Sequence, residues 1–192
     1  MPWEKSFDES DVIDKVMDVF WEKGYAATSI SDITDATGIK RGSLYNAFDG
    51  KHDLFLKALQ KYGSGERSKQ LRLLETIENP RKAIAMLFDL IVKDTLNDPA
   101  KKGCLLVNTA LDYSLHDESV QRVVTEGFKE VVVFIEKQIV RGQDQGDICE
   151  SVKPRATARA LVASLVGIRV LGRGTFDKAA LRQIGDQAQR LI

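Results

Sequence analysis

The most informative part of this chain is residues 20–51, which read FWEKGYAATSISDITDATGIKRGSLYNAFDGK. Two short runs in this stretch, 30–37 and 41–48, have helical periodicity and are joined by three residues that include Gly38. Ser29 and Asp32 have the spacing of a capping box at the start of the first run. Two short helices joined in this way are typical of a helix-turn-helix, whose second helix enters the major groove of DNA.

The second run divides into two faces. Leu44 and Phe48 are four residues apart, so we expect them to point inward together with Ile33 and Ala36 of the first run. The side chains left facing outward are polar or able to hydrogen-bond: Lys40, Arg41, Ser43, Tyr45 and Asn46. Arginine and lysine donate to guanine, asparagine pairs with adenine, and serine or tyrosine reaches phosphate. Gly42 allows another backbone or a phosphate to approach closely.

The rest of the chain has the same helical period and no hairpin signal. Further helices are predicted over 11–23, 51–62, 67–77, 80–96, 104–113, 117–145, 154–172 and 177–192. The fold class is therefore all-α, with about nine helices: a three-helix N-terminal domain and a C-terminal helical domain. The run Gly63-Ser64-Gly65 is the most flexible part of the sequence, and it predicts a division into residues 1–62 and 63–192.

The chain is neutral overall, with 28 basic and 28 acidic residues. A neutral total argues against a protein that coats nucleic acid through bulk charge. The charges are unevenly distributed, however. Residues 1–35 contain three Lys or Arg against nine Asp or Glu, whereas residues 36–62 contain five against two. Positive charge is thus concentrated at the expected reading helix and its successor, which suits a site-specific binder with weak general attraction to DNA.

Several other classes of protein are disfavoured. No GxSxG, GxGxxG or HExxH motif occurs, and two histidines cannot make a His-rich metal site, so we expect no enzyme, cofactor or metal. The longest nearly apolar run, 160–171, is too short to span a bilayer, and the N-terminus lacks a signal-peptide stretch. Cys104 and Cys149 form no CxxC motif, which favours a reducing cytoplasm. Either thiol could sense oxidation, although isolated cysteines are more often inert.

Residues 20–51 resemble the TetR family of transcriptional regulators, whose pattern is matched at Gly24-Tyr25, Thr28-Ser29, Gly42–Tyr45, Phe48 and Lys51. Residues 103–112 resemble, more weakly, an element of one subgroup. The resemblance implies phosphate contacts from Thr28, Ser29, Tyr45 and Lys51, with His52 nearby. It also implies base or groove contacts from Lys40, Arg41, Ser43 and Asn46. The chain departs from the family at residues 3–8, WEKSFD, where many members have a basic arm.

The resemblance further implies a C-terminal domain that binds a small molecule and dimerises. The apolar segments 156–171 and 178–192 match the two helices that the family uses for a four-helix dimer interface; burial within a monomer is the alternative. Candidate effector contacts lie on helices that surround the family's pocket: Phe88, Leu106, Asn108, Asp112, Phe128 and Phe134. These residues could equally be ordinary core, and Asn108 and Asp112 could cap neighbouring helices.

The sequence therefore predicts a homodimeric regulator, a repressor that a small molecule releases from a palindromic double-stranded operator. The alternative is a helical small-molecule-binding protein or enzyme with a vestigial DNA head. A sequence-independent DNA binder is a third reading, against which the neutral charge counts.

Overall fold

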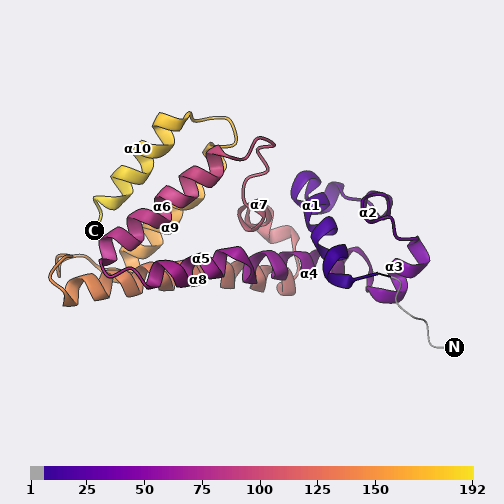
Figure 1. Cartoon of the computed structure of the whole chain (residues 1–192), viewed down its shortest axis with the longest axis horizontal. Helices are drawn as coiled ribbons and strands as arrows, with labels where there is room; N and C mark the ends of the chain where they lie inside the picture. The colour runs from indigo at the N-terminus through magenta and orange to yellow at the C-terminus, as the bar shows by residue number, and fades with distance from the viewer. Residues whose placement is uncertain (1–6) are drawn as a thin grey trace.

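The architecture is entirely helical over residues 7–192, the part of the chain that the computed structural model describes. It contains one 3-10 turn, Tyr113–Leu115, and ten α-helices: α1 (Glu9–Ala27), α2 (Ile30–Thr37), α3 (Arg41–Ala47), α4 (Gly50–Ser64), α5 (Glu66–Glu75), α6 (Pro80–Leu96), α7 (Leu105–Leu111), α8 (Glu118–Asp144), α9 (Pro154–Leu171) and α10 (Lys178–Gln189). The predicted all-α fold is confirmed. Helices α4 and α5 run end to end, interrupted only at Gly65, and together they form one rod beside α8 (Figure 1).

The N-terminal helices α1, α2 and α3 form a small head at one end of this rod (Figure 1). Its core consists of the buried stripe of α1 packed against α4, with Phe20 and Phe55 in edge-to-face contact at 5.0 Å. Gly24 has a positive φ of 76° and breaks the helical path of α1, but a further turn follows to Ala27. The predicted helix end at Gly24 is therefore a kink, because glycine adopts this backbone conformation without strain.

The helix-turn-helix has the local structure that the sequence predicts. Ser29 and Asp32 form the reciprocal capping box, and α2 ends at Gly38 in the left-handed conformation. Ile33, Leu44 and Phe48 are buried as expected, but Ala36 is exposed and its predicted inward position is wrong. Helix α2 packs mainly on α1, and Ala36 is left open to solvent.

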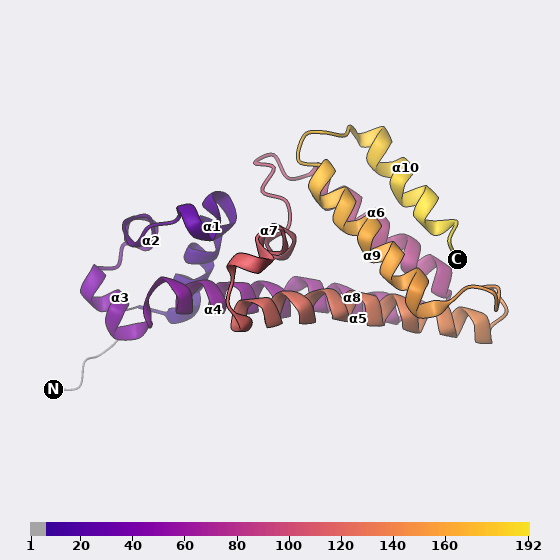
Figure 2. The same cartoon turned by 180° about the vertical axis from the view of Figure 1, so that it is seen from behind.

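The C-terminal helices enclose a second core. Helices α6, α9 and α10 stand over the far end of the rod (Figures 1 and 2), and their buried side chains meet those of α8 around Phe88, Ile135 and Leu161. Buried residues of α7 and α8, including Leu105 and Val120, belong instead to the core of the head. Gly63 is buried inside α4, so the helix passes the expected boundary without a break there. The division into 1–62 and 63–192 remains a proposal.

Asp117, the N-cap of α8, makes the stability of this helix depend on pH. Its carboxylate accepts hydrogen bonds from the Ser119 hydroxyl at 2.6 Å and from the backbone N–H groups of Ser119 and Val120. The Ser119 hydroxyl contributes most to lowering the pKa of Asp117 from 3.8 to about 2, and nearby His52 adds to the effect. Because the folded pKa is depressed, this stabilisation is present above about pH 4 and is lost as the pH falls toward 2.

We therefore expect Asp117→Asn, which still caps the helix but does not titrate, to flatten the fall of stability between pH 4 and pH 2. Urea midpoints measured by circular dichroism at several pH values test this, with Asp186→Asn on the exposed side of α10 as the matched control. Parallel pH profiles for Asp117→Asn and the unmodified protein would contradict the assignment.

Candidate nucleic-acid interface and effector cavity

Helix α3 presents a polar face to solvent. Leu44 lies fully buried beneath it, and Phe48 follows directly at its C-terminal end. Four of the side chains predicted to face outward are exposed, namely Lys40, Arg41, Tyr45 and Asn46, and Gly42 is exposed beside them. Ser43 is half-buried. The Arg41 guanidinium lies 5.7 Å from the centroid of the Tyr45 ring, one helical turn away. The structure thus provides a short, anchored helix whose free side carries donors and acceptors for base edges and phosphates.

The residues around α2 divide into exposed and buried positions. Ser29 is exposed at the N-terminus of α2, where backbone N–H groups favour an anion. Lys51 is half-buried; its Nζ lies 4.5 Å from the Tyr25 ring centroid and donates to the Ala26 carbonyl at 3.4 Å. Thr28 is only 2% exposed, and its hydroxyl donates to the Gly24 carbonyl. In this conformation the Thr28 side chain is not available to a phosphate, because the kink at Gly24 draws it inward.

His52 lies at the junction between the head and the C-terminal helices. Its Nε2 lies against the Asp117 carboxylate at the start of α8. His116 stacks on Phe55 at 5.5 Å in the same junction, and burial lowers the pKa of His116. The expectation that His52 sits near the DNA contacts stays a prediction, and in this structure its imidazole lies against the N-cap of α8.

Ion pairs also connect α1 to the C-terminal helices and to α4. Lys102, in the loop before α7, contacts Glu22 at 2.9 Å and Asp18 at 3.4 Å, both on α1. The hydrogen bond to Glu22 is the main reason that the pKa of Lys102 is raised. Lys61 of α4 pairs with Asp14 of α1 at 2.7 Å. The position of α1 is thus linked electrostatically to the segments that surround the cavity described next.

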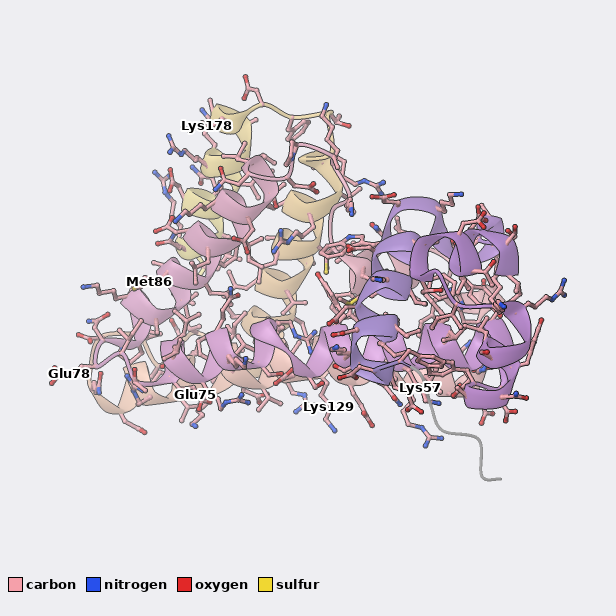
Figure 3. The ribbon with its side chains drawn as sticks, turned by 45° about the vertical axis from the view of Figure 1, so that its right-hand side comes forward. Lys57, Glu75, Glu78, Met86, Lys129 and Lys178 are labelled. Carbon is pink, nitrogen blue, oxygen red and sulfur yellow. The ribbon has the colours of Figure 1, made fainter. Side chains whose placement is uncertain are left out.

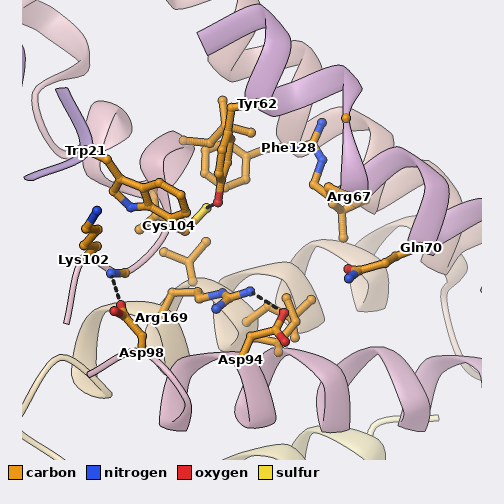
Figure 4. Close-up of a pocket in the computed structure, with 18 of the residues that line it drawn as sticks. Trp21, Tyr62, Arg67, Gln70, Asp94, Asp98, Lys102, Cys104, Phe128 and Arg169 are labelled. Carbon is orange, nitrogen blue, oxygen red and sulfur yellow. Dashed lines mark hydrogen bonds and ion pairs between the residues drawn. The ribbon is translucent and has the colours of Figure 1, made fainter. Parts of the chain in front are cut away.

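A cavity of about 700 Å³ lies between α1 and the C-terminal helices. Its walls are mainly apolar, and Figure 4 shows the rings of Trp21, Tyr62 and Phe128 across from the Arg169–Asp94 pair. Trp21 and Tyr62 meet edge to face, with ring centroids 5.0 Å apart. A volume of this size is typical of sites for drug-sized molecules, for which the usual range is about 300–1,000 Å³.

The structure places two of the six candidate effector residues at this cavity, Leu106 and Phe128. Phe88 and Phe134 are core residues, 1% and 3% exposed, and Phe134 borders a separate groove between α5 and α8. Asn108 donates to the Lys102 carbonyl and accepts from Arg173, so it holds a loop in place. Asp112 is exposed at the end of α7. These four are not cavity residues, because helical spacing alone does not say which apolar face meets a void.

Sequence reasoning missed the contribution of the head to the cavity. Met17 and Trp21 of α1 line it, as do Tyr62 of α4 and Arg169 of α9. One signal was present in the sequence: Trp21 falls outside the buried stripe of α1, so a large aromatic side chain required a second partner surface. No comparable signal marked Arg169, whose carboxylate partner Asp94 is 75 positions away.

The two cysteines have different surroundings. Cys104 lines the cavity, and its Sγ accepts a hydrogen bond from the Tyr62 hydroxyl at 3.4 Å. Cys149 is exposed, and a hydrogen bond with the Ser151 hydroxyl lowers its pKa. Oxidation sensing by either thiol stays a prediction.

The described part of the chain offers neither a metal site nor a membrane-spanning helix. No group of three His, Cys, Asp or Glu side chains there could hold a metal ion. No helix in the same range is long and apolar enough to cross a membrane.

Comparisons with known proteins agree with this geometry. The family model described as bacterial regulatory proteins, tetR family, matches residues 12–58, and the tetracyclin repressor-like C-terminal domain matches 80–187. The chain is 31% identical to the HTH-type transcriptional regulator YezE of Bacillus subtilis (strain 168), over 93% of this chain and 92% of YezE. It is 26% identical to the HTH-type transcriptional repressor ComR of Escherichia coli (strain K12), covering 97% and 90% of the two chains.

Among solved structures, the regulator CifR in complex with 26-bp double-strand operator DNA superimposes with a TM-score of 0.84. It has 26% identity to this chain, and the match covers 98% of both chains. A structure from Chloroflexus aurantiacus with 23% identity and a TM-score of 0.85 has the same fold. The two family models together with the relative YezE show that this chain belongs to the TetR family of bacterial transcriptional regulators.

Proposed function

We propose that this DNA-binding regulator is a cytoplasmic repressor that binds a palindromic operator as a homodimer and is released by a small molecule. The observation that carries the proposal is the polar face of α3, exposed over the buried Leu44 and Phe48. The names of relatives support it: ComR is called a repressor, and CifR was solved on operator DNA. A helix-turn-helix in a symmetric dimer reads two half-sites about one helical turn apart.

In this proposal the predicted contact residues of the head fall into two groups. Lys40, Arg41, Ser43 and Asn46 contact bases or groove walls, whereas Ser29, Tyr45 and Lys51 hold phosphates. Gly42 has open space where a Cβ would stand, so DNA can approach the backbone of α3. Occupancy of the cavity would favour a head position that does not fit successive major grooves, which is a population shift. Helix α4 is suited to couple the two, since it begins beside Lys51 and supplies Tyr62 to the cavity.

The outer face of α9 supports a homodimer. Ala156, Ala160 and Ala163 are exposed there at steps of four and three residues, and the half-buried Gly167 continues the same face. Small side chains allow two helices to approach closely, and a two-fold axis makes such a face self-complementary. We place the dimer contact at this face, with α10 beside it.

Binding to the DNA that flanks the protein's own gene tests the proposal. A gel shift that saturates at nanomolar protein and falls steeply with salt is expected, and Lys51→Ala should reduce the slope of log K against log salt by about one for each half-site. Lys129→Ala is the matched control, because Lys129 points into solvent from α8 (Figure 3).

Each outcome of this experiment has a clear meaning. Specific binding with an unchanged salt slope for Lys51→Ala would contradict a phosphate contact from Lys51 but would still support a site-specific regulator. Equal affinity for flanking and unrelated DNA would replace the site-specific repressor with a general DNA binder. No binding to either DNA would favour a helical small-molecule-binding protein.

A further inference from the structure

We propose that the cavity between α1 and the C-terminal helices binds an uncharged ring compound that carries a carbonyl or hydroxyl oxygen, and that this compound contacts α1 of the head directly. That this compound also acts as the effector of the repressor rests on the proposed function. Binding itself is a property of the protein without DNA.

The charges around the cavity argue against an ionic ligand. Every cationic side chain that lines it already has a carboxylate partner. Lys61 pairs with Asp14 at 2.7 Å, Arg67 with Glu130 at 2.7 Å, Lys102 with Glu22 at 2.9 Å and Arg169 with Asp94 at 3.4 Å. Asp98 accepts the backbone N–H of Gly103 at 2.7 Å. An anionic ligand would lose its hydration here without meeting an unpaired cation, and a cationic ligand would find only the Asp98 carboxylate, which already accepts a backbone N–H, so burial of either charge is unfavourable.

Two donors at the cavity wall lack a strong acceptor. The Tyr62 hydroxyl donates only to the thiol of Cys104, at 3.4 Å, and sulfur is a weak acceptor. Burial raises the pKa of Tyr62, so the phenol stays protonated and remains a donor. The indole N–H of Trp21 is buried and finds no acceptor in the described part of the chain. A neutral oxygen on the ligand would satisfy the Tyr62 hydroxyl better than the thiol does.

The aromatic wall indicates a ligand with rings. Trp21, Tyr62 and Phe128 gather on one side of the cavity (Figure 4), and apolar side chains of α6, α8 and α9 complete its lining. Aromatic rings favour offset or edge-to-face partners, so a planar ring system can add to this cluster. Trp21 and Met17 belong to α1, one turn apart, so a ligand in this wall touches the same helix that packs against α2.

Naphthalenes that differ only in one substituent test the chemistry. We would titrate the full-length protein, without DNA, by calorimetry with 2-acetylnaphthalene, 2-ethylnaphthalene, 2-naphthoate and 1-(2-naphthyl)ethylamine. The ketone is expected to bind at least tenfold more tightly than the anion and the cation. It should also bind about fivefold more tightly than the ethyl compound, the effect of one neutral hydrogen bond. Tighter binding of either ion than of the ketone would overturn the proposal.

Tyr62→Phe separates a ligand contact from a structural role. The ring remains, so binding of 2-ethylnaphthalene should stay within about twofold while the fivefold advantage of the ketone disappears. If Tyr62 has only a structural role, Tyr62→Phe will weaken the binding of both compounds equally, and Tyr62 is then not the hydrogen-bond donor to the ligand. For location, Val166→Trp fills the cavity from α9 and should abolish binding of the ketone. Val133→Trp, at an exposed position of α8, is the matched control and should change nothing.

Thermal unfolding of each variant shows whether it is folded. If Val166→Trp does not fold, the Tyr62→Phe comparison still decides the proposal. Unchanged ketone binding in a folded Val166→Trp protein would overturn the assigned site.

Contact with α1 has its own readout. The chain has two tryptophans, Trp3 and Trp21, so Trp3→Phe leaves Trp21 as the sole indole emitter. Saturating 2-acetylnaphthalene should quench this emission strongly, and the quenching should follow the calorimetric binding curve. Binding without quenching would show that the ligand does not touch α1. If the protein binds the ketone but not operator DNA, the inference about the cavity is supported and the proposed repressor function is contradicted. If it binds operator DNA but not the ketone, the repressor function is supported and the inference about the cavity is contradicted.

Discussion

Replacing Arg41 with alanine is expected to weaken operator binding by about 1–3 kcal/mol for each half-site, the effect of losing one good bidentate base contact. Arg41 is exposed on the first turn of α3, and the Tyr45 ring lies 5.7 Å from its guanidinium. That contact restricts the side chain before DNA arrives, so less rotamer entropy is lost on binding. Two half-sites in a dimer double the loss.

Fluorescence anisotropy with operator and with unrelated DNA of the same length measures this effect. Arg122→Ala, at an exposed arginine on α8, removes the same charge outside the helix-turn-helix and should leave the affinity within about twofold. An equal loss on both DNAs would assign Arg41 to phosphate and not to a base. An unchanged operator affinity would contradict the assignment of α3 as the helix that reads the bases.

Gly167→Arg is expected to convert the proposed dimer into a monomer and to lower operator affinity by about 10²- to 10⁴-fold, because the second head no longer binds as part of the same molecule. A Cβ at Gly167 would meet no atom within 4 Å in the protomer, so the first atom of the new side chain causes no clash there. Arginine is also a better helix former than glycine, which should leave α9 intact. In a dimer packed through this face, a long charged side chain would enter the contact between the two copies.

Sedimentation velocity gives the oligomeric state directly. Gln145→Arg, at the exposed C-terminal end of α8, adds the same charge and should sediment like the unmodified protein. If Gly167→Arg remains a dimer with full operator affinity, the dimer contact lies elsewhere on the molecule. If the unmodified protein is itself a monomer that binds operator tightly, the homodimer proposal fails.

Much of the secondary structure follows from a few residues at helix ends. Ser29 with Asp32, Asp117 and Asp177 cap helices where the sequence predicts helix starts, and Asn79 caps the helix predicted to begin at Pro80. Capping depends on contacts within one turn, so a short stretch of sequence carries the information. The faces of α3 were predicted for the same reason, since Leu44 and Phe48 are four residues apart. Ala36 departed, because its burial depended on the packing between helices, and Ser43 is half-buried and not fully exposed.

The cavity was much less accessible to sequence reasoning. Its walls come from seven helices, and the side chains that set its chemistry are far apart in the chain, as Trp21 and Arg169 show. Phe88 and Phe134 have the same helical spacing and apolar character as Phe128, yet only Phe128 borders the void. Whether an apolar side chain fills a core or lines a cavity depends on the volume that its neighbours leave open, which periodicity does not encode.

The sequence by itself determined the all-α class, the helix-turn-helix and the polar face of α3, because hydrophobic period and capping act over a few residues. It also identified the family. Only the tertiary structure decided that Thr28 turns inward, that His52 pairs with Asp117 and that α1 of the head forms a wall of the cavity. Each of these depends on packing between segments distant in the chain, where steric fit and charge pairing across helices select one arrangement.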